Sequence, residues 1–315
     1  MIKVNNLQKY FGPKIAVDDV SFSVEKGEVL GFLGPNGAGK STTMRMITGF
    51  IPPTSGSISV GGFDIIEKPL AAKRLIGYLP ENAPAYSDMT VAGFLAFAAE
   101  LRGLSGDAKR KAVHRAIEMC FLEPVADQTI ETLSKGYKHR TCFAQSILHD
   151  PDVLILDEPT DGLDPNQKHE VRTLIRTMGE KKAIIFSTHI LEEVEAVCSR
   201  AIIIDRGRIV ANGTPAELKR RCDHAGTVTV RLAKSAPGAA EKLAALPGVG
   251  KASQEGGLFH VIPCDKSGVG VAAAIYELAA REAWTLEELH TEEGRLDEVF
   301  RSITLGDKST KEVAA

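Results

Sequence analysis

The chain has 315 residues, a formal net charge of −3, and a composition that is 43% hydrophobic and 25% charged. This length allows about two domains of roughly 150 residues, large enough to fold around a hydrophobic core without disulfides or a structural metal. The near balance of charge argues against a protein built mainly to bind a long stretch of nucleic acid phosphates. The five cysteines include no CxxC pair, which favours buried thiols in a reducing compartment over a disulfide scaffold or a zinc site.

No segment of the sequence is expected to cross a membrane. A transmembrane helix needs about 20 predominantly apolar residues, whereas the most apolar segment, 89–101, is shorter and contains Glu100. The first residues, MIKVNNLQKYFG, lack the apolar core of a signal peptide. We therefore expect that any function at a membrane depends on another chain for the spanning part.

Over about the first 220 residues, short apolar runs alternate with stretches of helical periodicity. Four runs are nearly all apolar, as expected for parallel strands covered on both faces: 29–33, 153–156, 183–187 and 201–205. Between residues 88 and 130 the pattern changes to two amphipathic helices joined by a turn at 105–107. The sequence predicts an α/β domain over residues 1–221, built on a largely parallel sheet with a helical subdomain inserted at about 88–130.

A shift in composition at about residues 219–226 marks the start of a second unit. Seven elements are predicted there, in the order strand, helix, strand, strand, helix, strand, helix: 227–232, 239–246, 249–253, 258–262, 269–282, 284–289 and 296–303. The first six follow the β-α-β-β-α-β order of a ferredoxin-like split βαβ unit. We expect a small α+β domain over residues 222–306, followed by a polar tail at 307–315.

The segment GPNGAGKS at residues 34–41 matches GxxxxGK[ST] at every fixed position. Glycines let successive backbone N–H groups point inward as an anion cradle, and a helix starting near Lys40 directs the positive end of its dipole to the same point. A glycine-rich turn that carries Lys-Ser by chance is the alternative, but the position between a buried strand and a helix favours a phosphate site. The residues expected to bind the nucleotide are Gly34, Pro35, Asn36, Gly37, Ala38, Gly39, Lys40, Ser41 and Thr42.

Within this motif, we expect Lys40 to reach the β- and γ-phosphates and the Ser41 hydroxyl to coordinate Mg²⁺. Thr42 is expected to add a contact to the α-phosphate.

Two acids, Asp157 and Glu158, follow the apolar run at 153–156, at the carboxyl end of a predicted strand, where open α/β sheets bind their ligands. We expect Asp157 to hold Mg²⁺ and Glu158 to polarise the attacking water. A solvated acidic strand end is the alternative, and the P-loop argues against it. His189 lies at the end of another predicted strand, where we expect it to reach the γ-phosphate and orient the water rather than to be an ordinary polar residue.

These residues, together with two further motifs and an aromatic residue near the start of the chain, resemble the ATP-binding subunits of ATP-binding cassette (ABC) transporters over about residues 1–220. LSKGY at 133–137 is similar to the family's LSGGQ signature, PTDGLD at 159–164 to its D-loop, and His189 to its switch histidine. Phe11 stands where the family places an aromatic residue on adenine, with Tyr10 as the alternative. The resemblance implies a P-loop NTPase with the ABC cassette fold that hydrolyses ATP with Mg²⁺.

The same resemblance implies partners. ABC subunits pair head to tail around two ATP molecules, so that Ser134 and the N–H of Gly136 would bind the γ-phosphate of the partner's ATP, and Asp164 belongs to the nucleotide-binding set. The subunits also dock on a separate transmembrane permease, here through the helical subdomain and the loop of Glu81. This implies a location on the cytoplasmic face of the cell membrane, held there by the permease.

Two features depart from the family pattern. Glu81 stands where the family usually has Gln in contact with Mg²⁺ and water; a carboxylate can still bind Mg²⁺ but cannot donate a hydrogen bond. In the signature, Lys135 replaces Gly and Tyr137 replaces Gln. Because Ser134 and Gly136 remain, we expect ATPase activity to be preserved.

YLPE at 78–81, LSKGY and LDEVF at 296–300 together resemble the ABC-2-type exporter branch, which includes gliding-motility-like and copper-enzyme-maturation-like ATPases. For 296–300, a helix packed on a core is an equally valid interpretation, and both can hold. The sequence does not name the transported substrate.

A soluble ABC ATPase acting on ribosomes or DNA is the competing function. That class typically has two cassettes or a long coiled coil, and residues 222–315 contain ten Lys and Arg against fourteen Asp and Glu, a poor balance for binding phosphates. The second domain could instead sense a small molecule, but no polar cluster supports this, so a structural or dimer-stabilising role is favoured.

Overall fold

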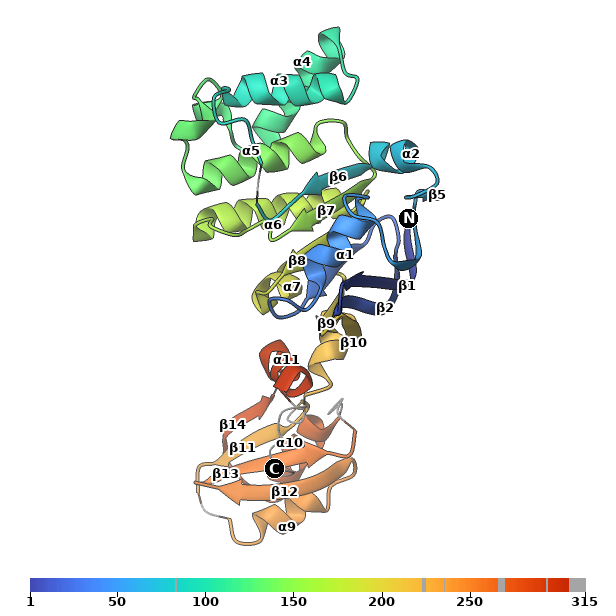
Figure 1. The fold of residues 1–315 in the computed structure, drawn as a ribbon. Coiled ribbons are helices and arrows are strands. Elements are labelled where there is room, and N and C mark those ends of the chain that lie inside the picture. Colours follow the sequence, from blue (N-terminus) through green and yellow to red (C-terminus); the bar gives the residue numbers. More distant parts are fainter. Residues whose placement is uncertain (83, 223–224, 235, 266–269, 293, 306–315) are drawn as a thin grey trace. The chain divides into compact units, whose positions relative to one another are not determined.

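The computed structural model describes residues 1–305 except 83, 223–224, 235, 266–269 and 293 (Figure 1). The chain divides into two compact units, Met1–Thr214 and a second that begins at Pro215. The predicted polar tail, 307–315, lies outside the described residues. Within the described part of the chain, no helix combines the length and the apolar character needed to span a membrane.

A six-stranded sheet forms the centre of the first unit, in the order β10-β9-β3-β8-β7-β6. Its strands are β3 (Val29–Leu33), β6 (Ile76–Leu79), β7 (Val153–Asp157), β8 (Ala183–Thr188), β9 (Arg200–Asp205) and β10 (Arg208–Gly213). All neighbours are parallel except β10, which pairs antiparallel with β9. The four strands predicted from apolar runs are confirmed as β3, β7, β8 and β9. Every residue of β3, β7 and β8 is buried, which explains their continuous apolar character.

The register of this sheet brings three strand ends together. Leu33, the last residue of β3, pairs with Thr188 of β8, and Asp157 of β7 pairs with Ser187. Parallel strands end at the same edge, so the P-loop after β3 and the acids at the end of β7 emerge at one edge of the sheet, with the end of β8 between them.

A second, antiparallel sheet in the first unit was not expected from the sequence, so the prediction of one largely parallel sheet is incomplete. It has the order β2-β1-β4-β5, with strands β1 (Ile2–Phe11), β2 (Lys14–Val24), β4 (Ser55–Val60) and β5 (Phe63–Asp64). These strands alternate buried and exposed residues and carry several register shifts, so they lack the continuous apolar runs that identified the other strands. Their buried faces join one core with the parallel sheet, through residues such as Val4, Val17, Phe32 and Met44.

Helices complete the first unit: α1 (Lys40–Ile47), α2 (Pro69–Arg74), α3 (Val91–Leu101), α4 (Gly106–Met119), α5 (Lys135–Ile147), α6 (Pro165–Gly179) and α7 (Leu191–Val197), with 3₁₀ turns at Glu123–Val125 and Ile130–Thr132. α3, α4 and α5 pack on one another as the helical subdomain (Figure 1). The predicted turn at 105–107 is wrong in detail. Ser105 is the N-cap residue of α4, and Gly106 and Asp107 already belong to the helix. A carboxylate in the first turn favours this earlier start because it lies at the positive end of the helix dipole.

The second unit contains α8 (Pro215–Lys219), β11 (Val228–Leu232), α9 (Ala239–Ala244), β12 (Val249–Glu255), β13 (Leu258–Pro263), α10 (Val271–Arg281), β14 (Leu286–Thr291) and α11 (Leu296–Leu305). Its antiparallel sheet has the order β12-β13-β11-β14, and the β-α-β-β-α-β chain order is the predicted one. The start of the second predicted helix, at 269, falls outside the described residues. Leu296 and Val299 of α11 are buried, so this helix does pack on a core.

Candidate nucleotide site

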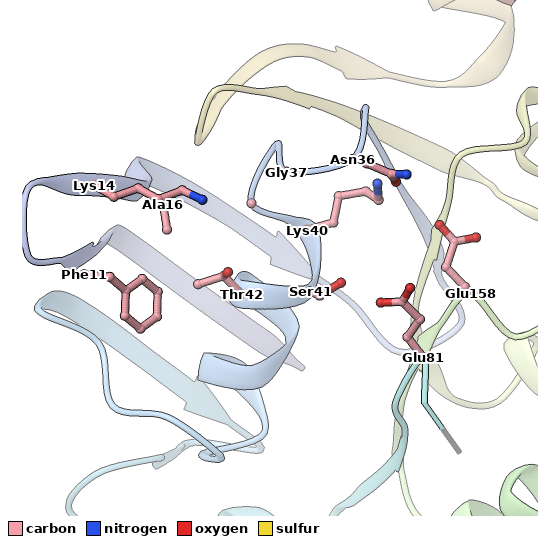
Figure 2. Close-up of a pocket in the computed structure, with 11 residues that line it drawn as sticks. Phe11, Lys14, Ala16, Asn36, Gly37, Lys40, Ser41, Thr42, Glu81 and Glu158 are labelled. Atoms are coloured by element: carbon pink, nitrogen blue, oxygen red, sulfur yellow. The ribbon is translucent and has the colours of Figure 1, made fainter. Parts of the chain in front are cut away.

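The P-loop joins β3 to α1 and forms one wall of a cavity of about 300 Å³. Figure 2 shows the side chains of Lys40, Ser41 and Thr42 between Phe11 on one side and Glu81 and Glu158 on the other. The lining consists of Phe11, Lys14, Ala16, Asn36, Gly37, Gly39, Lys40, Ser41, Thr42, Glu81 and Glu158. The cavity therefore collects residues from the P-loop, the antiparallel sheet, the loop after β6 and the end of β7.

Two glycines of the P-loop are required by close approach. A Cβ atom on Gly34 would lie 2.4 Å from the Ile204 carbonyl oxygen, and one on Gly39 would lie 2.5 Å from that of Ala16. Gly39 also has a φ of 109°, in the region that L side chains rarely adopt. Gly39 is the N-cap residue of α1 and brings no side chain to cap it, and the first residues of the helix, Lys40 and Ser41, line the cavity. The start of a helix carries backbone donors that favour an anion.

Lys40 lies buried across the P-loop. Its Nζ donates to the carbonyl oxygens of Gly34 at 2.6 Å and Pro35 at 3.3 Å. Burial lowers the pKa of Lys40, and the nearby carboxylates, first Glu158 and then Asp157, act in the opposite direction. The ammonium group is thus held at the cavity by weak acceptors that an anionic ligand can replace.

The two predicted acids differ in environment. Asp157 is fully buried; its Oδ1 accepts from the Ser187 hydroxyl at 2.5 Å, while its buried Oδ2 has no hydrogen-bond partner among the described residues. Glu158 has a φ of 52°, an uncommon conformation for a non-glycine residue. Its N–H donates to the Ser187 carbonyl oxygen at 3.1 Å, which fixes this turn, and its side chain enters the cavity (Figure 2). Strain of this kind is typical of functional sites.

His189 contacts Glu158 directly. Its Nδ1 lies 3.0 Å from both carboxylate oxygens of Glu158. Burial raises the pKa of Glu158, and the hydrogen bond and charge of His189 oppose that rise. Because an ionised carboxylate only accepts hydrogen bonds, Nδ1 carries the proton, and Nε2 of a neutral ring is left as an acceptor. The His189 side chain is 56% exposed, so the ring remains accessible.

The signature-like segment starts α5. Ser134 is the N-cap residue, and its Oγ accepts from the Tyr137 N–H at 3.4 Å. Gly136 packs closely on α6, where a Cβ atom would lie 2.7 Å from Gln167 Oε1. Lys135 Nζ lies 2.7 Å from Asp161 Oδ2, an ion pair that joins this segment to the D-loop-like segment.

Nine predicted site residues line the P-loop cavity: Phe11, Asn36, Gly37, Gly39, Lys40, Ser41, Thr42, Glu81 and Glu158. The other predicted residues lie outside the lining, and five of them belong to the segments that border it: Gly34, Pro35, Ala38, Asp157 and His189. Phe11 lines the P-loop cavity and Tyr10 lies outside the lining, as do Ser134, Gly136 and Asp164. Asp164 is the N-cap residue of α6, where its Oδ1 accepts from the Gln167 N–H at 2.9 Å. One chain by itself therefore does not bring the signature to its own P-loop.

Two lining residues, Lys14 and Ala16, were missed from the sequence. Both belong to β2. No motif marks them, and only the unpredicted antiparallel sheet brings β2 beside the P-loop. Among the described residues, no group of three or more His, Cys, Asp or Glu side chains is arranged to hold a metal ion.

A glycine-rich P-loop between β3 and α1, with carboxylates at the end of β7 two strands away, defines a P-loop nucleotide-binding protein. Comparison with known proteins narrows the class. The family model described as "ABC transporter" matches residues 17–161. The linearmycin resistance ATP-binding protein LnrL of Bacillus subtilis is 39% identical over 232 residues, or 73% of each chain. The Nod factor export ATP-binding protein I of Burkholderia orbicola is 39% identical over 215 residues, or 68% of this chain and 71% of its own.

Solved structures of ATP-binding cassette proteins also match this chain. An ATP-binding subunit of an ABC transporter matches with a TM-score of 0.65 and 31% identity, over 70% of this chain and 92% of its own. A dimeric ATP-binding cassette in a post-hydrolysis state, bound to ADP and Pi, matches with a TM-score of 0.64 over 68% of this chain and 99% of its own; at 22% identity this likeness is one of fold.

The chain belongs to the ABC transporter family, as one of its ATP-binding, ATP-hydrolysing proteins. The resemblance to the ATP-binding subunits of ABC transporters, stated from the sequence, is confirmed.

Proposed function

We propose that this chain powers a separate membrane permease of the ABC-2 exporter type by hydrolysing ATP between two copies of itself. One observation supports the proposed residue roles. Glu158, which contacts His189, lines the same cavity as Lys40 and Ser41. A base, its histidine partner and a phosphate cradle thus meet in one place.

ATP would bind with its phosphates on the P-loop. Lys40 would exchange the carbonyl oxygens of Gly34 and Pro35 for the β- and γ-phosphates, a stronger charge-assisted contact. The backbone N–H groups at the start of α1 would bind the same anion, with Thr42 beside the α-phosphate. Phe11, which is 50% exposed in the cavity, would stack on the adenine ring.

The donors present fit a magnesium ion. Asp157, which directly precedes the lining residue Glu158, has a buried carboxylate oxygen without a hydrogen-bond partner among the described residues. The Ser41 hydroxyl and the Glu81 carboxylate line the P-loop cavity. Mg²⁺ takes oxygen ligands, and in nucleotide sites it uses one or two carboxylates together with phosphates and water. When bound, the ion neutralises charge on the phosphate oxygens.

In the hydrolytic step, Glu158 would accept a proton from water as the water oxygen bonds to the γ-phosphorus. The bond from that phosphorus to the bridging oxygen breaks, and ADP and phosphate are released. His189 would hold Glu158 through Nδ1–H, and its Nε2 would accept a hydrogen bond from the attacking water and so orient it. The raised pKa of Glu158 makes it a better proton acceptor than an exposed glutamate.

Dimerisation is proposed because the signature residues lie away from the P-loop of their own chain. In a head-to-tail pair with two-fold symmetry, Ser134 and Gly136 of one copy would contact the γ-phosphate on the other, and Asp164 would lie beside that nucleotide. The dimeric cassette with ADP and Pi, which shares the fold, supports this arrangement. Closure on ATP and release after hydrolysis give the two states that drive a partner.

The permease would dock on the helical subdomain and the loop of Glu81, on the cytoplasmic face of the membrane. Tyr86 in this loop is 56% exposed and packs edge-on against Phe94 and Phe97 of α3, with ring centroids 6.2 and 5.7 Å away. This aromatic cluster offers an apolar contact for a permease helix. Relatives named for export and for resistance support the direction of transport.

Two measurements test this function. ATP turnover by the purified protein with its permease is expected to be lost in Lys40→Ala and in Glu158→Gln. Co-sedimentation with membranes is expected only when a multi-span partner is co-expressed. The proposal is wrong if Glu158→Gln hydrolyses ATP at the wild-type rate, and the permease assignment is wrong if the protein sediments with ribosomes instead.

A further inference from the structure

Glu193, in the first turn of α7, is a fully buried carboxylate that none of the roles above uses. A buried charge is costly unless hydrogen bonds and an opposite charge compensate it. Glu193 has both kinds of partner. Its Oε1 accepts from the Thr160 hydroxyl at 2.6 Å and from an Arg172 guanidinium nitrogen at 3.2 Å. Its Oε2 accepts from the Thr188 hydroxyl at 2.9 Å.

The two threonines belong to the segments that carry the proposed catalytic pair. Thr160 lies two residues after Glu158, and Thr188 directly precedes His189. One carboxylate therefore ties together the turn that follows Glu158 and the strand end that presents His189. The distance of 3.0 Å between His189 Nδ1 and the Glu158 oxygens depends on how these two segments are placed relative to each other.

The hydrogen-bond pattern requires an acceptor at both oxygens of Glu193. The Thr188 Oγ1 accepts from the Ile190 N–H at 3.0 Å and uses its own proton toward Glu193. An amide at position 193 would provide one acceptor and one donor group, so one of the two hydroxyls would lose its acceptor. Arg172 would also lose its anionic partner.

We propose that Glu193 is a positioning residue for the Glu158–His189 pair: by accepting from Thr160 and Thr188 it holds the base and the histidine in hydrogen-bond contact. This inference rests on the proposed roles of Glu158 and His189. It predicts that loss of Glu193 slows the chemical step and leaves the P-loop able to bind ATP, because Lys40 and the P-loop backbone make no hydrogen bond to it.

The test compares Glu193→Gln with Glu192→Gln, a matched control at the exposed neighbouring position of the same helix. We expect Glu193→Gln to lower kcat by roughly 10- to 100-fold, the effect of a small misplacement of reacting groups. The KM for ATP and the affinity for a non-hydrolysable ATP analogue should stay within about twofold of the control. A twofold change is small, since a tenfold change in affinity corresponds to about 1.4 kcal/mol. Equal kcat in the two variants overturns the inference, as does a loss of affinity in step with kcat.

A second pair of variants keeps the test decisive if Glu193→Gln unfolds. Thr188→Ser keeps the hydroxyl and should retain turnover, whereas Thr188→Val removes it and should reproduce the kcat defect with unchanged ATP affinity. Equal turnover in these two variants contradicts the inference.

The outcomes also separate this inference from the proposed function. If Glu158→Gln leaves hydrolysis intact, the catalytic assignment itself fails. If Glu158→Gln abolishes hydrolysis while Glu193→Gln and Thr188→Val match their controls, only the positioning role of Glu193 fails.

Discussion

Removal of the Phe11 ring should weaken nucleotide binding through the base alone. Phe11 is half-exposed at one end of the cavity, opposite Glu81 and Glu158 (Figure 2), so part of its side chain is accessible to adenine. Stacking of a base on an aromatic side chain contributes about 1–3 kcal/mol when measured by alanine substitution. At 1.4 kcal/mol per tenfold change, Phe11→Ala should raise the Kd for ATP by roughly 5- to 150-fold.

The assay is equilibrium binding of ATP, ADP and inorganic triphosphate to Phe11→Ala, with Phe11→Tyr as the conservative variant. ATP and ADP should weaken equally, triphosphate should be unaffected, and Phe11→Tyr should bind as the wild type does. Lys9 Nζ lies 5.2 Å from the Phe11 ring centroid, so a small loss of stability, about 0.5–1 kcal/mol, should accompany the change.

Tyr10→Ala is the matched control because Tyr10 is the adjacent aromatic residue and lies outside the cavity lining. A wild-type Kd for ATP in Phe11→Ala, or a larger loss in Tyr10→Ala, would refute the placement of adenine on Phe11.

Four further predictions concern the P-loop, the proposed catalytic pair and the second unit. Gly39→Ala should abolish ATP binding, since its Cβ would lie 2.5 Å from the Ala16 carbonyl oxygen and its φ of 109° would add strain; measurable ATP affinity would contradict this. As the proposed base, Glu158 would work only when ionised, and burial raises its pKa, so kcat should fall with decreasing pH sooner than for an exposed glutamate. His189→Ala removes the interaction that lowers this pKa, so the acidic limb of any residual activity should move to higher pH; an unchanged limb counts against the pair. Gly294→Ala should destabilise the second unit by about 1–3 kcal/mol or more, because its Cβ would lie 2.1 Å from a backbone carbonyl oxygen, and an unchanged Tm would contradict that packing.

The parts of the fold that the sequence predicts are those with strong local signals. β3, β7, β8 and β9 are short apolar runs covered on both faces, and the P-loop is a contiguous motif. The antiparallel sheet escaped prediction because β1 and β2 mix polar and apolar residues and pair through register shifts. Lys14 and Ala16 were not predicted as site residues for the same reason, since their position beside the P-loop depends on that strand pairing.

The role proposed for Glu193 could not be predicted from the sequence either, because it depends on contacts with other elements. The segment ILEEVEAV contains three acids, and nothing in their chemistry distinguishes the buried one from Glu192 and Glu195, which are exposed. Helical spacing does place Glu193 on the face of Val194 and Val197, which are buried. Its partners Thr160 and Thr188 come from other elements, so only the fold identifies what it holds.

The most direct test of the central claim mixes two inactive chains. Lys40→Ala removes the P-loop lysine, and Ser134→Arg blocks the signature of the other chain. If each ATP is bound between the P-loop of one copy and the signature of the other, a mixed pair contains one intact site. Equal mixing should then restore about one quarter of the wild-type number of sites, because half of randomly formed two-fold pairs are mixed. ATP turnover that stays at the sum of the two separate variants would contradict a site shared between two copies.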